Sequence, residues 1–275
     1  MNKKSFRDSF NLSNKVAIVT GGAGILGRHF CAGLAESGAK VVVVDIQEPK
    51  AKDLAQELSQ RYKTKAIGIG CDVSQPESVN QMISAVLSEF GEIHILHNNA
   101  AAKSDDLDAF FAPFEQYSLD QWRTIMSVNL DGIFLVAQAV GKQMIRQGKG
   151  GSVIQTASVY GVIAPDQRIY EGSLYLERQI NTPAVYSASK AGVIGLTQYL
   201  STYWAKYGIR VNTLTPGGVE SGQNDEFKRR YSNRVPLNRM AHAEEMVGAL
   251  LYLASDASSY VTGQNIIVDG GLTAW

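Results

Sequence analysis

The stretch VAIVTGGAGILGRHF, residues 16–30, decides the fold that this chain is expected to adopt. A short apolar run leads into glycines and then into an amphipathic pattern, which predicts a strand, a tight turn and a helix in that order. Such a loop can hold a diphosphate, because its glycines let backbone N–H groups and the helix N-terminus approach an anion. Two spacings, G-x-G-x-x-G and T-G-x-x-G-x-x-G, both fit the set Thr20, Gly21, Gly22, Gly24 and Gly27.

Apolar runs alternate with helical patterns along the rest of the chain. The runs are continuously apolar, as in strands that are buried on both faces. They predict strands at 16–20, 40–45, 66–70, 93–97, 152–156, 209–215 and 265–268. This alternation predicts an α/β fold: one doubly wound (Rossmann) domain, in which a parallel seven-stranded sheet carries helices on both faces.

Two further patterns refine this expectation. A long helix is predicted over 119–147, and Ser74 with Glu77 has the spacing of a capping box at the start of another helix. We expect an N-terminal extension at 1–14, followed by the single domain at 15–275.

Composition excludes several classes of protein. The 26 basic and 26 acidic residues cancel, so neither nucleic acid nor an anionic membrane is expected as a partner. With only Cys31 and Cys71, no disulfide framework is expected, which favours the cytoplasm. Residues 1–14 lack an apolar core, so no targeting segment is expected, and no run approaches about 18 uninterrupted apolar residues. No metal is expected, because His94 and His97 would point to opposite faces of a strand.

Polar and glycine residues follow six of the predicted strands directly. In a doubly wound sheet, ligands bind outside the carboxyl ends of the strands. The residues at these ends are Gly22–Gly27, Asp45, Asp72, Asn98, Asn99, Ser158, Pro216 and Gly217. We therefore expect the binding site to be assembled along this one edge of the sheet.

Asp45 closes the second predicted strand, about 20 residues beyond the glycine loop, where an acid binds the ribose 2′-hydroxyl of a dinucleotide. A carboxylate there repels a 2′-phosphate. No Arg or Lys lies in the loop up to Gly27 or directly after Asp45 to compensate for it. NAD is therefore favoured over NADP. Asp72 is expected near the adenine or, alternatively, as a turn or cap residue.

Tyr186 and Lys190 are four residues apart at the start of an amphipathic pattern, so they share one face of a helix. A phenol has a pKa of about 10, and lowering it by about three units requires roughly 4 kcal/mol of preference for the phenolate. One ammonium at about 4 Å supplies about 1 kcal/mol in bulk water but about 4 kcal/mol at an effective dielectric constant near 20. Lys190 can therefore activate Tyr186 only in a site that is largely closed to water.

Two further polar residues are candidates for the same chemistry. Ser158 follows the fifth predicted strand, where its hydroxyl could stabilise charge on a reacting oxygen, or could simply be a turn serine. Asn129 lies inside an otherwise apolar helical pattern, where a hydrogen-bonded core asparagine is the alternative.

From about residue 12 onward, the chain resembles the short-chain dehydrogenase/reductase family. The matching elements are Thr20–Gly27, Asp72, NNAA at 98–101, Asn129, Ser158, Tyr186, Lys190, PGG at 216–218 and YVTGQNIIVDGG at 260–271.

The resemblance implies roles for these residues. Tyr186 would be the acid/base, Lys190 would lower its pKa and hold the nicotinamide ribose, and Ser158 would position the reacting oxygen. Asn129 would anchor a water that relays protons through Lys190. Asn98 and the turn at 216–219 would line the cofactor. The full set of expected cofactor contacts is Gly21, Gly22, Gly24, Ile25, Leu26, Gly27, Asp45, Ile46, Asp72, Val73, Asn99, Ala100, Tyr186, Lys190, Pro216, Gly217 and Val219.

Three features depart from the family pattern. The loop lacks the usual middle glycine, since Ile25 stands there, and its form resembles the longer epimerase branch, whereas NNAA and VDGG resemble the short single-domain branch, to which we assign the chain. Ala101 replaces a glycine after NNA. Ser158 and Tyr186 are 28 positions apart, well beyond the usual spacing. We expect the segments 159–185 and 219–240 to cover the substrate and to exclude water.

Arginines in these segments suit phosphate or carboxylate recognition, with a solvated charged surface as the alternative. They are Arg168, Arg178, Arg229, Arg230 and Arg234, accompanied by Lys228.

The leading hypothesis is an oxidoreductase that interconverts a secondary alcohol and a ketone with NAD, acting on a sugar or sugar-derived polyol that carries a phosphate or lacks one. The chain also resembles a bacterial subgroup linked to flagellin and surface-glycan sugar pathways. A 3-oxoacyl thioester reductase and a non-catalytic NAD-binding regulator or scaffold are the alternatives. The resemblance further implies a homo-dimer or homo-tetramer that pairs through helices at 119–147 and 185–206.

Overall fold

Seven parallel strands form one sheet in the order β3-β2-β1-β4-β5-β8-β9. The computed structural model describes residues 5–102, 106–175 and 177–275. The strands are β1 Val16–Thr20, β2 Lys40–Asp45, β3 Ala66–Gly70, β4 Ile95–Asn98, β5 Gly151–Thr156, β8 Ile209–Pro216 and β9 Asn265–Val268. The strand order reverses between β1 and β4, and such a reversal opens a crevice at the carboxyl edge of the sheet. The predicted Rossmann fold is confirmed.

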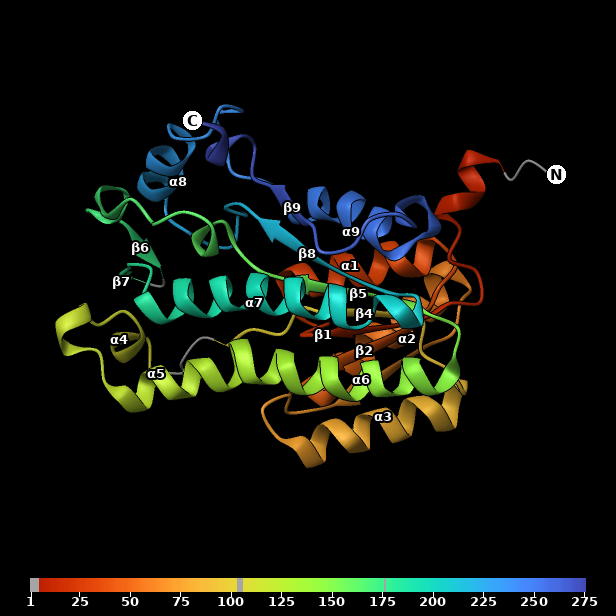
Figure 1. The fold of residues 1–275 in the computed structure, drawn as a ribbon. Helices are drawn as coiled ribbons and strands as arrows, with labels where there is room; N and C mark the ends of the chain where they lie inside the picture. Colours follow the sequence, from red (N-terminus) through yellow and green to blue (C-terminus); the bar gives the residue numbers. More distant parts are fainter. Residues whose placement is uncertain (1–4, 103–105, 176) are drawn as a thin grey trace.

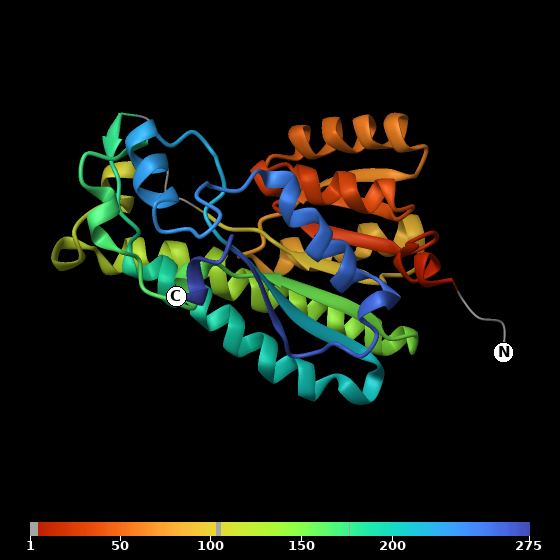
Figure 2. The same cartoon turned by 90° about the horizontal axis from the view of Figure 1, so that it is seen from above.

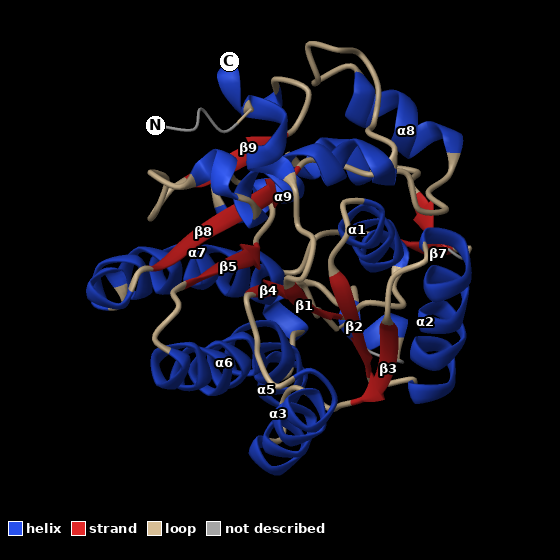
Figure 3. Cartoon of the chain, turned by 90° about the vertical axis from the view of Figure 1, so that its right-hand side faces the viewer, coloured by secondary structure: helices blue, strands red, loops and turns tan. Residues whose placement is uncertain are grey.

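Helices cover both faces of this sheet, as Figure 3 shows. One layer consists of α1 Ile25–Glu36, α2 Glu48–Tyr62 and α9 Val247–Ala254, and the other of α3 Pro76–Phe90, α6 Ile133–Gln147 and α7 Ala184–Tyr203. The strands are apolar throughout because successive side chains enter opposite layers. On β2, Val41 and Val43 pack toward the first layer, while Val42 and Val44 pack toward the second.

The stretch Leu119–Gln147 is helical throughout, as predicted. The helix α5, Leu119–Met126, continues through a π-helical turn at Ser127–Gly132 into α6. Among the described residues it is the one helix long and apolar enough to cross a membrane by length and composition. Its buried face, which includes Val140, packs into the core beside α3, as the face of a core helix does.

Two local predictions are wrong. The capping box does not form: α3 begins at Pro76 after Gln75, whose side chain makes no capping hydrogen bond. Ser74 instead donates hydrogen bonds to Asp72 from its backbone N and its hydroxyl, so the pair closes a turn before the helix. The fourth strand begins at Ile95 rather than at residue 93.

Four small elements lie beyond the carboxyl ends of the strands, at the left in Figures 1 and 2. They are α4 Leu107–Phe110, α8 Asp225–Ser232 and the antiparallel strands β6 Leu174–Tyr175 and β7 Arg178–Gln179. Residues from the two expected covering segments share one hydrophobic cluster, in which Tyr170 from the first contacts Phe227 from the second. The sequence patterns predicted neither the hairpin nor the contribution of α4.

Residues 5–15, the described part of the chain before β1, are tied to the domain through Leu12. A short 3-10 helix at Phe6–Phe10 begins with a capping box that Ser5 and Asp8 form. Leu12 is 1% exposed and belongs to the core of the first layer. The extension therefore ends in the core.

Candidate active site

The glycine loop after β1 leaves the start of α1 open. Gly21 has φ +61°, and a Cβ there would lie 3.0 Å from the Cα of Ala100. Gly27 is more constrained, because a Cβ would lie 2.1 Å from the carbonyl oxygen of Gly21. Gly24 caps α1 without a side-chain hydrogen bond, so the first N–H groups of the helix have no side-chain acceptor. The loop is thus shaped for an anionic group at a helix N-terminus.

Thr20 fixes the loop to the neighbouring strand, a role that sequence reasoning missed. Its buried hydroxyl donates to Oδ1 of Asn98 (3.2 Å) and accepts from the backbone N–H groups of Asn99 (2.9 Å) and Ala100 (3.0 Å). One side chain therefore joins the carboxyl ends of β1 and β4, where the strand order reverses.

Asp45 stands at the end of β2 with both carboxylate oxygens engaged by backbone. Oδ2 accepts from the N–H of Ala23 and Oδ1 from the N–H of Gln47, each at 3.1 Å. The carboxylate therefore braces the glycine loop and also lines the cleft. Gln47 and Lys50 line the cleft as well, although sequence reasoning did not select them. Lys50 is a cation five positions beyond Asp45, so the argument against a 2′-phosphate is weaker than the residues directly after Asp45 indicated.

A cleft of about 970 Å³ runs along the carboxyl edge of the sheet. Sixteen of the seventeen expected cofactor contacts line it: Gly21, Gly24, Ile25, Leu26, Gly27, Asp45, Ile46, Asp72, Val73, Asn99, Ala100, Tyr186, Lys190, Pro216, Gly217 and Val219. Ser158 lines it too.

Three expected site residues lie behind the wall of the cleft. Gly22 donates its N–H to the Val44 carbonyl, and a Cβ there would meet Val43, so this glycine serves the packing of the loop on β2. Asn98 is buried and donates to the carbonyl of Ile133, which ties β4 to α6. Asn129, treated below, is also outside the lining.

The shape of the cleft fits a nicotinamide dinucleotide. Its loop end offers the open helix N-terminus, and the Asp45 carboxylate lines its second-strand end, where a dinucleotide would place a ribose. Asp72 also lines this end, and its Oδ1 accepts hydrogen bonds from the Ser74 backbone N–H and hydroxyl; the turn role is observed, and the position near an adenine stays a prediction. Beyond these residues the cleft continues to Tyr186 and Lys190, one turn apart on α7.

The catalytic candidates converge in the middle of the cleft. Ser158 follows β5 in extended conformation, and its Oγ accepts from the N–H of Tyr160 at 3.2 Å. Tyr186 lies in the first turn of α7 and is partly exposed, while Lys190 is 2% exposed. The Lys190 ammonium donates to the backbone carbonyl of Thr156 at 3.0 Å, and its Nζ lies 5.9 Å from the centre of the Tyr186 ring.

The pKa values in this pair differ from the expectation for the phenol. Burial lowers the pKa of Lys190 to about 8. Burial likewise raises the pKa of Tyr186 above its ordinary value; the Ser158 hydroxyl beside it acts in the opposite direction, and Tyr170 reinforces the increase. The expected lowering by Lys190 is therefore absent from the protein by itself. The Lys190 ammonium points toward the Thr156 carbonyl, and burial disfavours the charged form of both Lys190 and Tyr186.

Asn129 lies in the π-helical turn between α5 and α6 and is fully buried. Its Oδ1 accepts from the N–H of Ala102 at 2.8 Å, which ties the turn to the chain after β4. Its Nδ2 has no hydrogen-bond partner within the described ranges. Asn129 is thus a core asparagine on one side and has an open donor on the other, so its relay role stays a prediction.

The histidines do not form a metal site. His94 lies before β4 and its Nδ1 accepts from the N–H of Val16, while His97 is buried against Thr156. Burial lowers the pKa of His97 to about 3, so its imidazole is neutral. Over the described part of the chain, no three His, Cys, Asp or Glu residues are grouped so that they could hold a metal ion.

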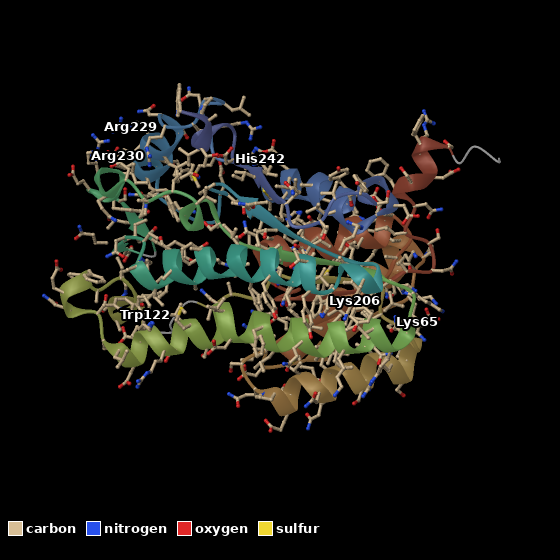
Figure 4. The ribbon with its side chains drawn as sticks, in the orientation of Figure 1. Lys65, Trp122, Lys206, Arg229, Arg230 and His242 are labelled. Atoms are coloured by element: carbon tan, nitrogen blue, oxygen red, sulfur yellow. The ribbon has the colours of Figure 1, made fainter. Side chains whose placement is uncertain are left out.

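The arginines of the covering segments are held by carboxylates and do not line the cleft. Arg168 pairs with Asp166 and Arg178 with Asp108, while Arg229 and Arg230 both pair with Glu226. Figure 4 shows Arg229 and Arg230 at the outer edge of the molecule, on α8. Of the two alternatives, the solvated and paired charged surface agrees with these contacts.

Known proteins resemble this chain over nearly its whole length. Residues 21–273 match the family model described as Enoyl-(Acyl carrier protein) reductase. The D-threitol dehydrogenase of Mycolicibacterium smegmatis is 34% identical over 273 residues, which cover 96% of this chain and 95% of that protein. The NAD-dependent glycerol dehydrogenase of Listeria innocua is 33% identical over 285 residues and 99% of each chain. The crystal structure of a gluconate 5-dehydrogenase from Burkholderia cenocepacia, in complex with NADP and tartrate, has a TM-score of 0.86 and 35% identity, with 98% of each chain covered.

These similarities agree with the site. The glycine loop, the acid after β2 and the Tyr186–Lys190 pair on α7 lie along one cleft, in a fold that the relatives share at high coverage. An oxidoreductase that acts on alcohol groups with a nicotinamide cofactor accounts for all of them. This chain belongs to the short-chain dehydrogenase/reductase family.

Proposed function

We propose that this enzyme interconverts a secondary hydroxyl group and a ketone on a polyol or sugar, with Tyr186 as the acid/base. The observation that carries the proposal is the meeting of Ser158, Tyr186 and Lys190 midway along a cleft whose other arm fits a dinucleotide. The names of the relatives, a threitol dehydrogenase and a glycerol dehydrogenase among them, support a polyol as the substrate class.

A bound nicotinamide ring would accept the hydride in the oxidation direction, and in its oxidised form it would add a positive charge to the site. The residues of the chain then handle the proton. The Ser158 hydroxyl hydrogen-bonds the reacting oxygen. In oxidation the Tyr186 phenolate, whose own proton has passed to solvent, takes the proton of the substrate hydroxyl as the ketone forms, and in reduction the Tyr186 phenol returns it. Because the pKa of Tyr186 is raised in the protein alone, the phenol needs this added positive charge before it can act as a base.

Lys190 has two roles in this proposal. The Thr156 carbonyl orients its ammonium within the cleft, where it can hold a ribose hydroxyl. With a pKa of about 8, it exchanges a proton with solvent near neutral pH. The buried Asn129, with its open donor, would anchor the water that connects Lys190 to solvent.

We further propose that NAD is the preferred cofactor. The carboxylate of Asp45 at the cleft favours a free 2′-hydroxyl, and one relative is named as NAD-dependent. Lys50 supports the competing choice, as does the relative crystallised with NADP. Thermal shift with NAD and NADP separately decides between them: a larger rise in melting temperature with NADP contradicts this preference.

A homo-dimer or homo-tetramer in the cytoplasm completes the proposal. The helix α7 exposes Tyr199 and Tyr203, whose rings stack at 5.7 Å, and α6 exposes Phe134. A second subunit would cover these aromatic side chains. Light scattering coupled to size exclusion tests the state, and a monomer at micromolar concentration contradicts it.

Tyr186→Phe tests the catalytic proposal. We expect kcat for polyol oxidation to fall by about a thousandfold or more while NAD binding is retained, because only the acid/base hydroxyl is removed. Tyr260→Phe, fully exposed on the surface, is the matched control and should keep full activity. Unaltered turnover by Tyr186→Phe contradicts the proposal and favours another acid/base. Activity on 3-oxoacyl thioesters alone favours the acyl reductase alternative, and NAD binding without turnover of any alcohol favours a regulator.

A further inference from the structure

The substrate end of the cleft, beyond Ser158 and Tyr186, is aromatic and polar but carries no charged side chain among the described residues. Of all described residues that line the cleft, the groups charged at neutral pH are Asp45, Lys50, Asp72 and Lys190. The first three follow β2 and β3 at the nucleotide end, and the Thr156 carbonyl holds Lys190. The described residues therefore place no charged side chain at the substrate end.

The nearby cations are turned to other partners. Arg234, from the segment after α8, pairs through its Nε with Asp166 at 3.5 Å and does not line the cleft, although its buried Nη1 has no partner among the described residues. The ion pair of Arg178 with Asp108 joins the hairpin to α4, again outside the lining. Burying a phosphate or carboxylate against the described lining of this pocket would remove its hydration without a cation in the lining to compensate, which costs binding.

Two polar groups at this end have open hydrogen-bonding capacity. The Nδ2 of Asn181 donates to the Phe111 carbonyl at 2.8 Å, which fixes the amide, and its buried Oδ1 has no donor among the described residues. The buried hydroxyl of Tyr160 has no described partner in regular hydrogen-bond geometry; the Tyr170 hydroxyl lies near it, and their interaction adds to burial in raising the pKa of Tyr160.

The hydroxyls of Tyr170 and Tyr231 are already engaged. The Tyr170 hydroxyl pairs with the Thr182 hydroxyl at 2.5 Å, and the Tyr231 hydroxyl accepts from the Gly218 N–H at 2.5 Å. The Tyr170 ring stacks with the Phe227 ring at a centroid distance of 5.9 Å, and the Phe227 ring stacks with the Tyr231 ring at 5.8 Å. This layer offers ring surface to the C–H bonds of a ligand while its own polar atoms are satisfied.

We propose that the substrate is an uncharged polyhydroxylated molecule, an alditol or the ketose that corresponds to it. Tyr160 and Asn181 are its specificity-determining residues and hydrogen-bond the hydroxyl groups next to the reacting carbon. The inference rests on the proposed function, and it makes a phosphorylated sugar or an aldonate a poor substrate. A ligand hydroxyl can donate to Oδ1 of Asn181 and exchange a hydrogen bond with Tyr160, so it satisfies both buried groups.

The test compares substrates of one chain length: an alditol, its terminal phosphate and the matching aldonate, each with NAD and with NADP. We expect kcat/KM for the alditol to exceed that for both anions by about 100-fold or more. Higher kcat/KM for the phosphate or the aldonate overturns the inference while the proposed function stands. If no member of the panel is turned over, the proposed function fails. Calorimetry with NAD-loaded protein then decides the inference alone, and tighter binding of either anion overturns it.

Variants test the two residues. In Tyr160→Phe and in Asn181→Ala, we expect the ratio of kcat/KM for the alditol to kcat/KM for 2-propanol to fall by about tenfold, the value of one lost hydrogen bond. Tyr260→Phe, exposed on the surface, should leave this ratio unchanged. An unchanged ratio in both pocket variants, with melting temperatures near that of the parent enzyme, overturns the assignment of these residues.

Discussion

Replacing Lys190 by methionine should make the protein more stable while it abolishes activity. The pKa of this lysine falls from 10.5 to about 8 because its ammonium is buried. At about 1.36 kcal/mol for each unit, a charged Lys190 costs the folded state about 3 kcal/mol. The hydrogen bond to the Thr156 carbonyl, which the variant loses, is worth about 1 kcal/mol. We therefore expect Lys190→Met to raise the free energy of unfolding by about 2 kcal/mol at pH 7.

The pH dependence of this difference gives a sharper test. Between pH 8 and 10.5 the unfolded chain binds the lysine proton more strongly than the folded chain, so the stability of the parent enzyme rises with pH across this window. Below pH 8 both states are protonated and the full cost is present. The advantage of Lys190→Met should therefore be constant at low pH and should shrink as the pH approaches 10.5.

Urea unfolding of the cofactor-free protein measures this difference, followed by the fluorescence of the buried Trp204. Lys206→Met, at an exposed position shown in Figure 4, is the matched control and should change stability little at any pH. The reasoning is refuted if Lys190→Met is less stable than the parent at pH 7, or if the difference between the two proteins does not vary with pH.

Two more predictions follow from the nucleotide end. Gly27→Ala should destabilise the protein by about 3 kcal/mol or more and weaken NAD binding, because its Cβ would overlap the Gly21 carbonyl. Gly195→Ala on α7 is the control: its Cβ meets nothing within 4 Å, so it should stabilise the helix slightly. Equal melting temperatures for the two variants would contradict this prediction. Asp45→Ser should raise the ratio of kcat/KM with NADP to kcat/KM with NAD by about tenfold or more, because it removes the carboxylate and leaves Lys50. Steady-state kinetics with both cofactors measures this ratio. An unchanged ratio would mean that other residues discriminate between the cofactors.

The sheet could be predicted almost residue by residue because its strands are buried on both faces. Continuous runs such as that of β2 leave little alternative to a central parallel strand. The positions of Tyr186 and Lys190 follow from helical spacing alone. Sixteen of the seventeen cofactor contacts that the family resemblance implied line the cleft, and most of them follow strands, because the carboxyl ends of parallel strands meet at one edge.

The exceptions depend on contacts that spacing does not encode. Gly22 and Asn98 belong to the motifs but face the core. Gly22 packs closely against Val43, and Asn98 donates a hydrogen bond to the Ile133 carbonyl. Thr20 acts across 79 residues on Asn99, so no local pattern shows it. The residue types in the π-helical turn that holds Asn129 do not differ from those of an α-helix, so the sequence does not indicate this turn. The pKa of Tyr186 is raised because its phenol is buried, and spacing along the chain does not show that burial.

The hairpin, α4 and α8 come from three distant parts of the sequence and meet at the mouth of the cleft. Backbone bridging joins Tyr175 to Gln223, and an ion pair joins Arg178 to Asp108. None of these contacts involves the seven-stranded sheet, so selectivity could be redesigned by grafting without disturbing the catalytic scaffold. Exchanging one segment alone would leave the residues that it contacts on the other two segments without partners, so all three must be exchanged together.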